Sequence, residues 1–168
     1  EASVDLGKEV RGGDPPEFSG CDITFADQSD RDNTVDLASR GFSLSRFHSD
    51  PLIDDAIADQ IKASWTGNFF SGKRGTHMAV AKNAGAVIGF ILLDVRPDSF
   101  QIDLMAVDAG WRGKGVGSSL VKFTEKAFPD RKYISVTTEL RNTEAVNLYL
   151  RNGFYLLGGA YTLHLHKE

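Results

Sequence analysis

The sequence is poor in the features that mark several protein classes. Its 168 residues include one cysteine, Cys21, so an intrachain disulfide is excluded and a metal site cannot rest on thiolates. The longest apolar stretch, Ala86 to Val95, is interrupted by Gly89 and Asp94 and reaches about half of the ~20 residues that a membrane-spanning helix needs. None of the four histidines is paired with another at helical i, i+4 spacing. We therefore expect neither a membrane span nor a metal centre.

An excess of positive charge is also missing. The chain has 19 basic and 23 acidic residues, a formal net charge of −4, so its surface as a whole is not built to coat nucleic acid, and any anion site must be local. The lone thiol suits a reducing cytoplasm. Several glycines and prolines with few large apolar residues predict a flexible lead-in over residues 1–20, followed by one domain over residues 21–168.

The order of apolar patterns predicts an α+β domain with a mixed, mostly antiparallel sheet. The expected elements are, in chain order, a strand at 23–25, a helical turn at 34–38, a helix opened by Asp50-Pro51, strands at 77–82, 86–95 and 100–107, a helix at 116–127, a strand at 133–139, a helix at 142–151, and strands at 154–157 and 161–166. Asp50 offers an N-cap acceptor and Pro51 suits the first helical position, which is why we place a helix start there.

A glycine-rich segment stands between a predicted strand and a predicted helix: Arg112-Gly113-Lys114-Gly115-Val116-Gly117-Ser118. Glycines let the main chain approach a ligand closely, and the helix dipole favours negative charge, so N–H groups here could hold a pyrophosphate. A P-loop would need Ser or Thr after Lys114, and a dinucleotide fingerprint would need a glycine where Ser118 stands. Both fail. A glycine-rich turn that binds nothing remains the alternative.

The segment also contains Arg112-x-x-Gly115-x-Gly117, which resembles the Q/R-x-x-G-x-G/A signature of the GNAT superfamily of acetyl-CoA-dependent N-acetyltransferases. Downstream, Asn142 and Tyr149 stand seven residues apart and are followed by a Gly-Phe pair, which resembles the second motif of that family. The two motifs cover about half of the chain in the family's order. The resemblance implies a GNAT-type sheet with flanking helices, in which the fourth and fifth strands splay apart.

By this resemblance the co-substrate is acetyl-CoA. Its pantetheine arm would lie between the splayed strands, where amide groups can pair with a free strand edge as in strand addition. The residues implied in cofactor binding are Met105, Ala106, Val107, Arg112, Gly113, Lys114, Gly115, Val116, Gly117, Ser118 and Asn142.

Acetyl transfer to an amine requires a neutral nucleophile and a proton for the departing thiolate. The resemblance implies that Tyr149 donates that proton, although its spacing alone is also that of a core aromatic residue. Asp103 and Glu139 are the candidates for the base, and either could equally be a solvated carboxylate at a strand end. Family members with a base on the fifth strand carry it five residues before the Asn, where this sequence has Thr137, so a water relay is an open alternative.

The acceptor side in this family is built by the N-terminal helices and the last strands. Three segments there, at 45–51, 73–75 and 161–164, resemble bacterial N-acetyltransferases that act on nucleotide-linked amino sugars. The candidate acceptor-binding residues are Arg46, Phe47, His48, Trp65 and Phe70. Cations at 46, 73 and 74 could meet a diphosphate, and aromatic rings could stack on a base or sugar, although ordinary surface charge explains them equally well.

Three functions are compatible with these motifs. The favoured partner is a small-molecule amine, acetylated by direct attack on the thioester. A protein or peptide amine is the alternative acceptor and would predict an open acidic groove. A domain that binds acetyl-CoA as a sensor without turnover is the second alternative, against which the presence of both Asn142 and Tyr149 argues. The sequence leaves a homodimer open.

Overall fold

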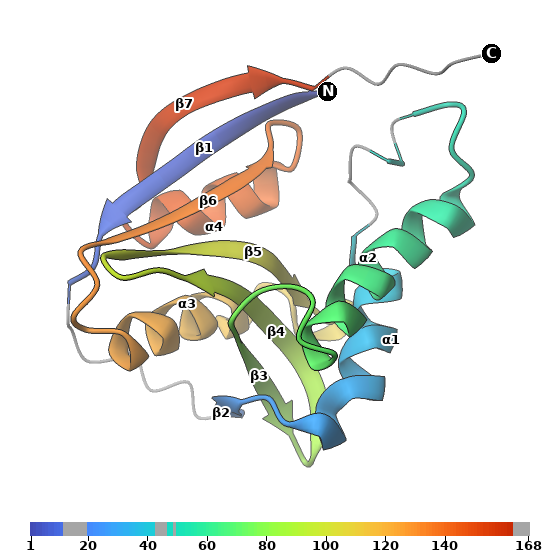
Figure 1. Ribbon diagram of the computed structural model, residues 1–168, viewed down its shortest axis with the longest axis horizontal. Coiled ribbons are helices and arrows are strands. Elements are labelled where there is room, and N and C mark those ends of the chain that lie inside the picture. The colour runs from blue at the N-terminus through green and yellow to red at the C-terminus, as the bar shows by residue number, and fades with distance from the viewer. Residues whose placement is uncertain (12–19, 43–46, 49, 163–168) are drawn as a thin grey trace.

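The computed structural model describes residues 1–11, 20–42, 47–48 and 50–162. They form one seven-stranded sheet in the order β2-β3-β4-β5-β6-β1-β7, with helices on both faces (Figure 1). The strands are β1 Ala2–Glu9, β2 Asp22–Phe25, β3 His77–Asn83, β4 Ala86–Val95, β5 Ser99–Val107, β6 Tyr133–Glu139 and β7 Tyr155–Tyr161. The helices are α1 Arg31–Gly41, α2 Asp55–Phe70, α3 Val116–Ala127 and α4 Thr143–Arg151, with short 3₁₀ turns η1 Gln28–Asp30 and η2 Ala109–Trp111.

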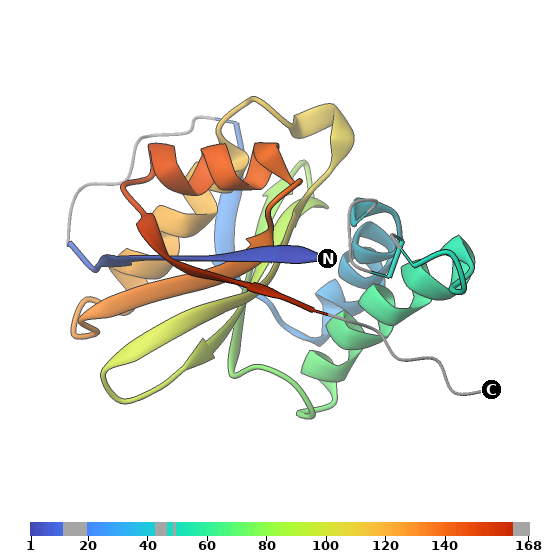
Figure 2. The same ribbon diagram turned by 90° about the horizontal axis from the view of Figure 1, so that it is seen from above.

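The expected α+β class is confirmed. β2 to β5 form an antiparallel meander, and only the β5–β6 pair is parallel. Figures 1 and 2 show that α1 and α2 pack together on one face of the sheet and that α3 and α4 lie on the opposite face. Each face therefore has its own core, one under α3 and α4 and one under α1 and α2.

The first strand contradicts the expected flexible lead-in over residues 1–20. Residues 2–9 form β1, which lies between β6 and β7 and is antiparallel to both. Val4 and Leu6 point into the core under α3 and α4. Local composition missed this strand because its partners are supplied by segments more than a hundred residues away, and strand formation depends on such context. Residues 12–19 lie outside the described residues.

The start of α2 and the last strands also differ from expectation. α2 begins at Asp55, and its N-cap is Asp54, whose carboxylate accepts from the Ala56 N–H at 2.8 Å. Asp50 instead accepts from the Leu52 N–H in a turn that precedes the helix. The N-cap is therefore Asp54 and not Asp50. β7 covers Tyr155–Tyr161 and so runs beyond the strand expected at 154–157. Most of the other expected strand, at 161–166, lies outside the described residues.

The sheet opens between β5 and β6. The two strands are paired from Ser99 to Ile102 and from Tyr133 to Val136, and they separate beyond those residues. On its other side β5 stays paired with β4 as far as Val107. The register shifts within this ladder, so that no residue of β4 lies opposite Asp103. Such an extra residue bends a strand. The expected splay of the fourth and fifth strands of the GNAT-type sheet, which are β5 and β6 here, is thus present.

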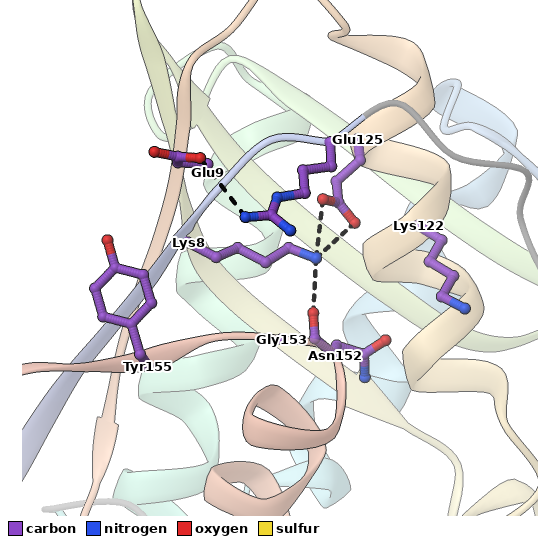
Figure 3. A pocket seen from close by; sticks show the side chains of 8 residues that line it. Lys8, Glu9, Lys122, Glu125, Asn152, Gly153 and Tyr155 are labelled. Atoms are coloured by element: carbon purple, nitrogen blue, oxygen red, sulfur yellow. Dashed lines mark hydrogen bonds and ion pairs between the residues drawn. The ribbon is translucent and has the colours of Figure 1, made fainter.

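A nearly buried ion pair fastens β1 to the helices. Lys8 Nζ lies 2.9 Å from both carboxylate oxygens of Glu125 on α3 and donates to the main-chain carbonyl of Asn152, after α4, at 2.7 Å (Figure 3). The Lys8 and Glu125 side chains are 15% and 8% exposed. A neighbouring hollow of about 540 Å³ is lined mainly by charged and polar residues. Among them, Lys8 and Glu125 are bound to each other in this ion pair. The pair therefore joins β1, α3 and the end of α4.

We expect Lys8→Met to lower the free energy of unfolding at pH 7 by about 3–5 kcal/mol, because it leaves the Glu125 carboxylate without its cation. Urea unfolding followed by circular dichroism measures the change. The double variant Lys8→Met/Glu125→Leu should recover most of the loss, since apolar groups of similar volume tolerate this site. A single variant as stable as the parent would contradict the structural role of the pair.

Candidate active site

A cleft of about 620 Å³ occupies the opening between β5 and β6. Its walls include β5 from Ile102 to Val107, β6 from Val136 to Glu139, the first turn of α3, and α4 along its length as far as Arg151. The edge of β5 that faces β6 has no strand partner from Asp103 onward within the described residues. Main-chain amide groups along that edge can therefore pair with an extended ligand that carries amides.

The turn before α3 is shaped to hold an anion. Gly113 and Gly115 have φ of 72° and 88°, in the left-handed region that glycine adopts without strain, and Gly115 is the N-cap of α3. Within the described ranges, the main-chain N–H groups of residues 113–118 have no hydrogen-bond acceptor. Because the helix dipole adds partial positive charge at the same place, this turn suits a phosphate group.

The side chain of Arg112 ties this turn to neighbouring elements. Its Nε donates to the Val107 carbonyl at 3.2 Å, and its Nη2 donates to the Gly41 carbonyl at the end of α1 at 3.4 Å. A second link runs from Arg40 to Asp108 at 2.8 Å. The Arg40 guanidinium, together with a main-chain N–H, holds the pKa of Asp108 below its usual range. The C-terminal end of α1 is thus bound to the segment between β5 and α3 through Arg40 as well as through Arg112.

Tyr149 lies inside the cleft wall. Its side chain is 3% exposed, its ring lies 5.2 Å from the Phe154 ring, and no described group hydrogen-bonds its hydroxyl. Burial raises the pKa of the phenol, so it stays protonated at neutral pH. The helix that carries it starts at Asn142, whose side chain accepts from the Ala145 N–H at 3.1 Å. Asn142 therefore positions the helix that bears the phenol.

The two carboxylates predicted as bases have different surroundings, although both line the cleft. Asp103 is held by Arg74 through two hydrogen bonds of 2.6 and 2.7 Å, and the Arg74 guanidinium lies 4.1 Å from the centre of the Trp65 ring. Glu139, at the end of β6, is half-buried. Both carboxylate oxygens of Asp103 are therefore occupied by the Arg74 guanidinium.

The cofactor-binding residues implied by the motifs converge on this cleft. All of them line it except Lys114, whose Nζ lies 5.0 Å from the centre of the Trp111 ring. At Gly117 the absent side chain matters for packing, because a Cβ there would lie 3.2 Å from Leu148 on α4. The close approach of α3 and α4 thus depends on this glycine.

The expected acceptor residues lie beside the cleft rather than in its wall. The Phe47 ring lies 5.7 Å from the Trp65 ring, His48 lies 3.1 Å from Asp59, and Phe70 packs on the core. Arg46 lies outside the described residues.

Several residues that line the cleft were missed by the sequence analysis: Phe42, Lys62, Trp111, Asn147 and Arg151. Lys62 Nζ lies 5.2 Å from the Phe42 ring centre and 4.6 Å from that of Trp65, so a cation that lines the cleft sits among aromatic rings. Asn147 and Arg151 are spaced i, i+4 on α4, and that spacing is the signal that could have indicated a shared helix face.

Comparison with known proteins agrees with this geometry. Residues 74–156 match the model of the acetyltransferase (GNAT) domain. The chain is 33% identical over 153 residues to the spore coat polysaccharide biosynthesis protein SpsD of Bacillus subtilis, covering 90% of this chain and 52% of that protein. It therefore spans about half the length of this relative.

Solved structures share the fold. A conserved protein of unknown function from Staphylococcus epidermidis superposes with a TM-score of 0.71 at 15% identity, over 94% of this chain and 58% of the other. A GNAT-family acetyltransferase from Colwellia psychrerythraea superposes with a TM-score of 0.67 at 14% identity, over 93% and 53%. The domain match places residues 74–156 in the GNAT acetyltransferase family, and the solved structures share its fold.

No helix among the described residues is both long enough and apolar enough to cross a bilayer. No group of three or more His, Cys, Asp or Glu side chains there is arranged to hold a metal ion.

The buried phenol makes stability depend on alkaline pH. The folded-state pKa of Tyr149 lies above its unfolded value of about 10, so its contribution is complete below pH ~10 and is lost as the pH rises through the folded value. Above pH ~10 we expect the parent to lose up to about 1.4 kcal/mol of unfolding free energy per pH unit more than Tyr149→Phe. Urea unfolding across pH 7–11 measures this, with the exposed Tyr161→Phe as control. Parallel curves for parent and Tyr149→Phe would contradict it.

Proposed function

We propose that this chain transfers the acetyl group of acetyl-CoA to a primary amine of a small molecule, in the class of nucleotide-linked amino sugars. One observation carries the proposal: an unpaired strand edge, a turn with unpaired N–H groups and a buried, protonated phenol all border one cleft. Pantetheine amides suit the edge of β5, and the pyrophosphate suits the turn at 113–118. This arrangement directs the thioester toward α4.

The reaction follows from these placements. The neutral amine attacks the thioester carbon, and main-chain N–H groups at the end of β5 stabilise the oxyanion. The C–S bond then breaks, and Tyr149 donates its proton to the departing thiolate. A phenol suits this task because burial keeps it protonated until sulfur carries the charge.

The acceptor class rests on the residues at the other end of the cleft. Lys62 on α2 and Arg74, just before β3, lie against Trp65, so cations and an aromatic ring are brought together there. Cations suit a diphosphate, and aromatic rings suit the face of a sugar or base. The relative SpsD is named for polysaccharide biosynthesis, which supports a sugar-linked amine.

Thiol release with purified protein, acetyl-CoA and a panel of amines tests the proposal. The panel comprises UDP-glucosamine, D-glucosamine, an N-terminal peptide and spermidine, and we expect turnover with the nucleotide amino sugar. Tyr149→Phe should lower kcat tenfold or more with little change in acetyl-CoA affinity, because only the leaving thiolate needs the proton. Tyr161→Phe serves as the control. No turnover with any amine would favour a sensor, and full activity of Tyr149→Phe would remove its assigned role.

The cofactor turn can be tested by calorimetry. We expect Gly115→Val to raise the Kd for acetyl-CoA at least tenfold, because valine is excluded at a φ of 88° and the turn must rearrange. The matched control is Gly85→Val in the hairpin between β3 and β4, where φ is 82° and no atom lies near an added Cβ. Equal affinities for the two variants would contradict the assignment of the phosphate site.

A further inference from the structure

The strand β1 brings a carboxylate to the wall of the cleft. Asp5 lies directly opposite Thr137 in the ladder between β1 and β6, and the Thr137 hydroxyl donates to Asp5 Oδ1 at 2.6 Å. Thr137 itself lines the cleft. Because directly paired residues project from the same face of a sheet, Asp5 stands just behind Thr137 as seen from the cleft.

This face is the one that remains open to an acceptor. The residues that alternate with Thr137, Val136 and Thr138, are buried under α3 and α4, whereas Thr137 is exposed on the opposite side. The phenol of Tyr149 reaches the cleft from α4. The Asp5–Thr137 pair and the proton donor for sulfur thus belong to opposite faces of the sheet, as the two ends of an acyl transfer require.

Asp5 differs from the other carboxylates at the site in what it binds. Asp103 is held by the Arg74 guanidinium. Asp5, in the part of the chain that the structure describes, belongs to no ion pair, and its recorded side-chain hydrogen bond comes from a neutral hydroxyl. A carboxylate that accepts from a hydroxyl, and not from a cation, keeps the ability to take up a proton through that hydroxyl.

We propose that Asp5 and Thr137 form a relay that removes the proton of the attacking amine, a step that rests on the proposed acetyl transfer. As the nitrogen lone pair forms the C–N bond, the amine proton passes to Thr137 Oγ1, and the hydroxyl proton of Thr137 passes to Asp5 Oδ1. The C–S bond breaks, the sulfur leaves with the electron pair and takes the Tyr149 proton. Solvent returns the proton from Asp5 to the phenolate, so neither side chain is consumed.

Other groups near the relay also titrate. On β6 the neighbouring carboxylate is Glu139, at the start of β1 it is Glu1 with Arg141 at 3.2 Å, and on β7 the nearest titratable side chain in the ladder is Tyr155. None of these is changed in the test, so a difference between parent and variant profiles belongs to the relay. Asp5 does not border the cleft and acts through Thr137, so it is a relay residue.

The test compares Asp5→Asn, Thr137→Val and Thr137→Ser with the parent in thiol release from acetyl-CoA, with UDP-glucosamine, D-glucosamine and spermidine each as the amine. Asparagine still accepts from Thr137, so the ladder contact is preserved while proton uptake is lost. We expect Asp5→Asn and Thr137→Val each to lower kcat/KM at least tenfold across the pH range tested, while the acid limb that protonation of the amine itself causes is kept by the parent and by every variant. Thr137→Ser should retain most of the rate. The double variant should be no worse than either single variant, because both break one relay.

Two further measurements separate the relay from a structural contact. The Kd for acetyl-CoA and the Tm should be unchanged in Asp5→Asn, and Asp98→Asn in the turn before β5 is the control. If the parent releases thiol and Asp5→Asn matches its rate and pH profile, the relay is overturned while acetyl transfer stands. If the parent releases no thiol with any of the three amines, the proposed function fails and the relay fails with it.

Discussion

The site depends on the separation of β5 and β6 beyond Ile102 and Val136. Two parallel strands that stay paired would satisfy each other's main-chain groups and leave no room for a ligand. Here the register shift at Asp103 bends β5, and the edge that faces β6 loses its partner. Unpaired amide groups are costly when they are buried, so such an edge favours a ligand that can pair with them. The cleft follows from this opening.

The surroundings of the titratable groups differ between the two faces of the sheet. On the α3 and α4 face, burial raises the pKa of Tyr149 and keeps it a proton donor. On the other face, the carboxylates lie among polar groups: Asp103 is bound by a guanidinium and Asp5 by a hydroxyl.

The position of β1 links stability to the site. It fills the space between β6 and β7, and Lys8 at one end anchors it to α3 and the end of α4. In the middle of the same strand, Asp5 lies opposite Thr137 and accepts a hydrogen bond from its hydroxyl. Residues 2–9, which the sequence analysis expected to belong to a flexible lead-in, therefore complete the sheet and contribute a polar group beside the cleft. β1 thus belongs to the same sheet as the strands of the region that matches the GNAT domain.

The sequence by itself determined the α+β class, β4 to its exact limits, the amphipathic helices α3 and α4, and the glycine-rich turn between β5 and α3, because these depend on local periodicity and on contiguous motifs. It could not determine β1, the start of α2, the ion pairs of Asp103 and Lys8, or the approach of Asp5 to Thr137. Those features depend on contacts between residues far apart in the chain. Strand pairing and side-chain partners are selected by the free energy of the whole packed molecule, so only the tertiary structure decided them.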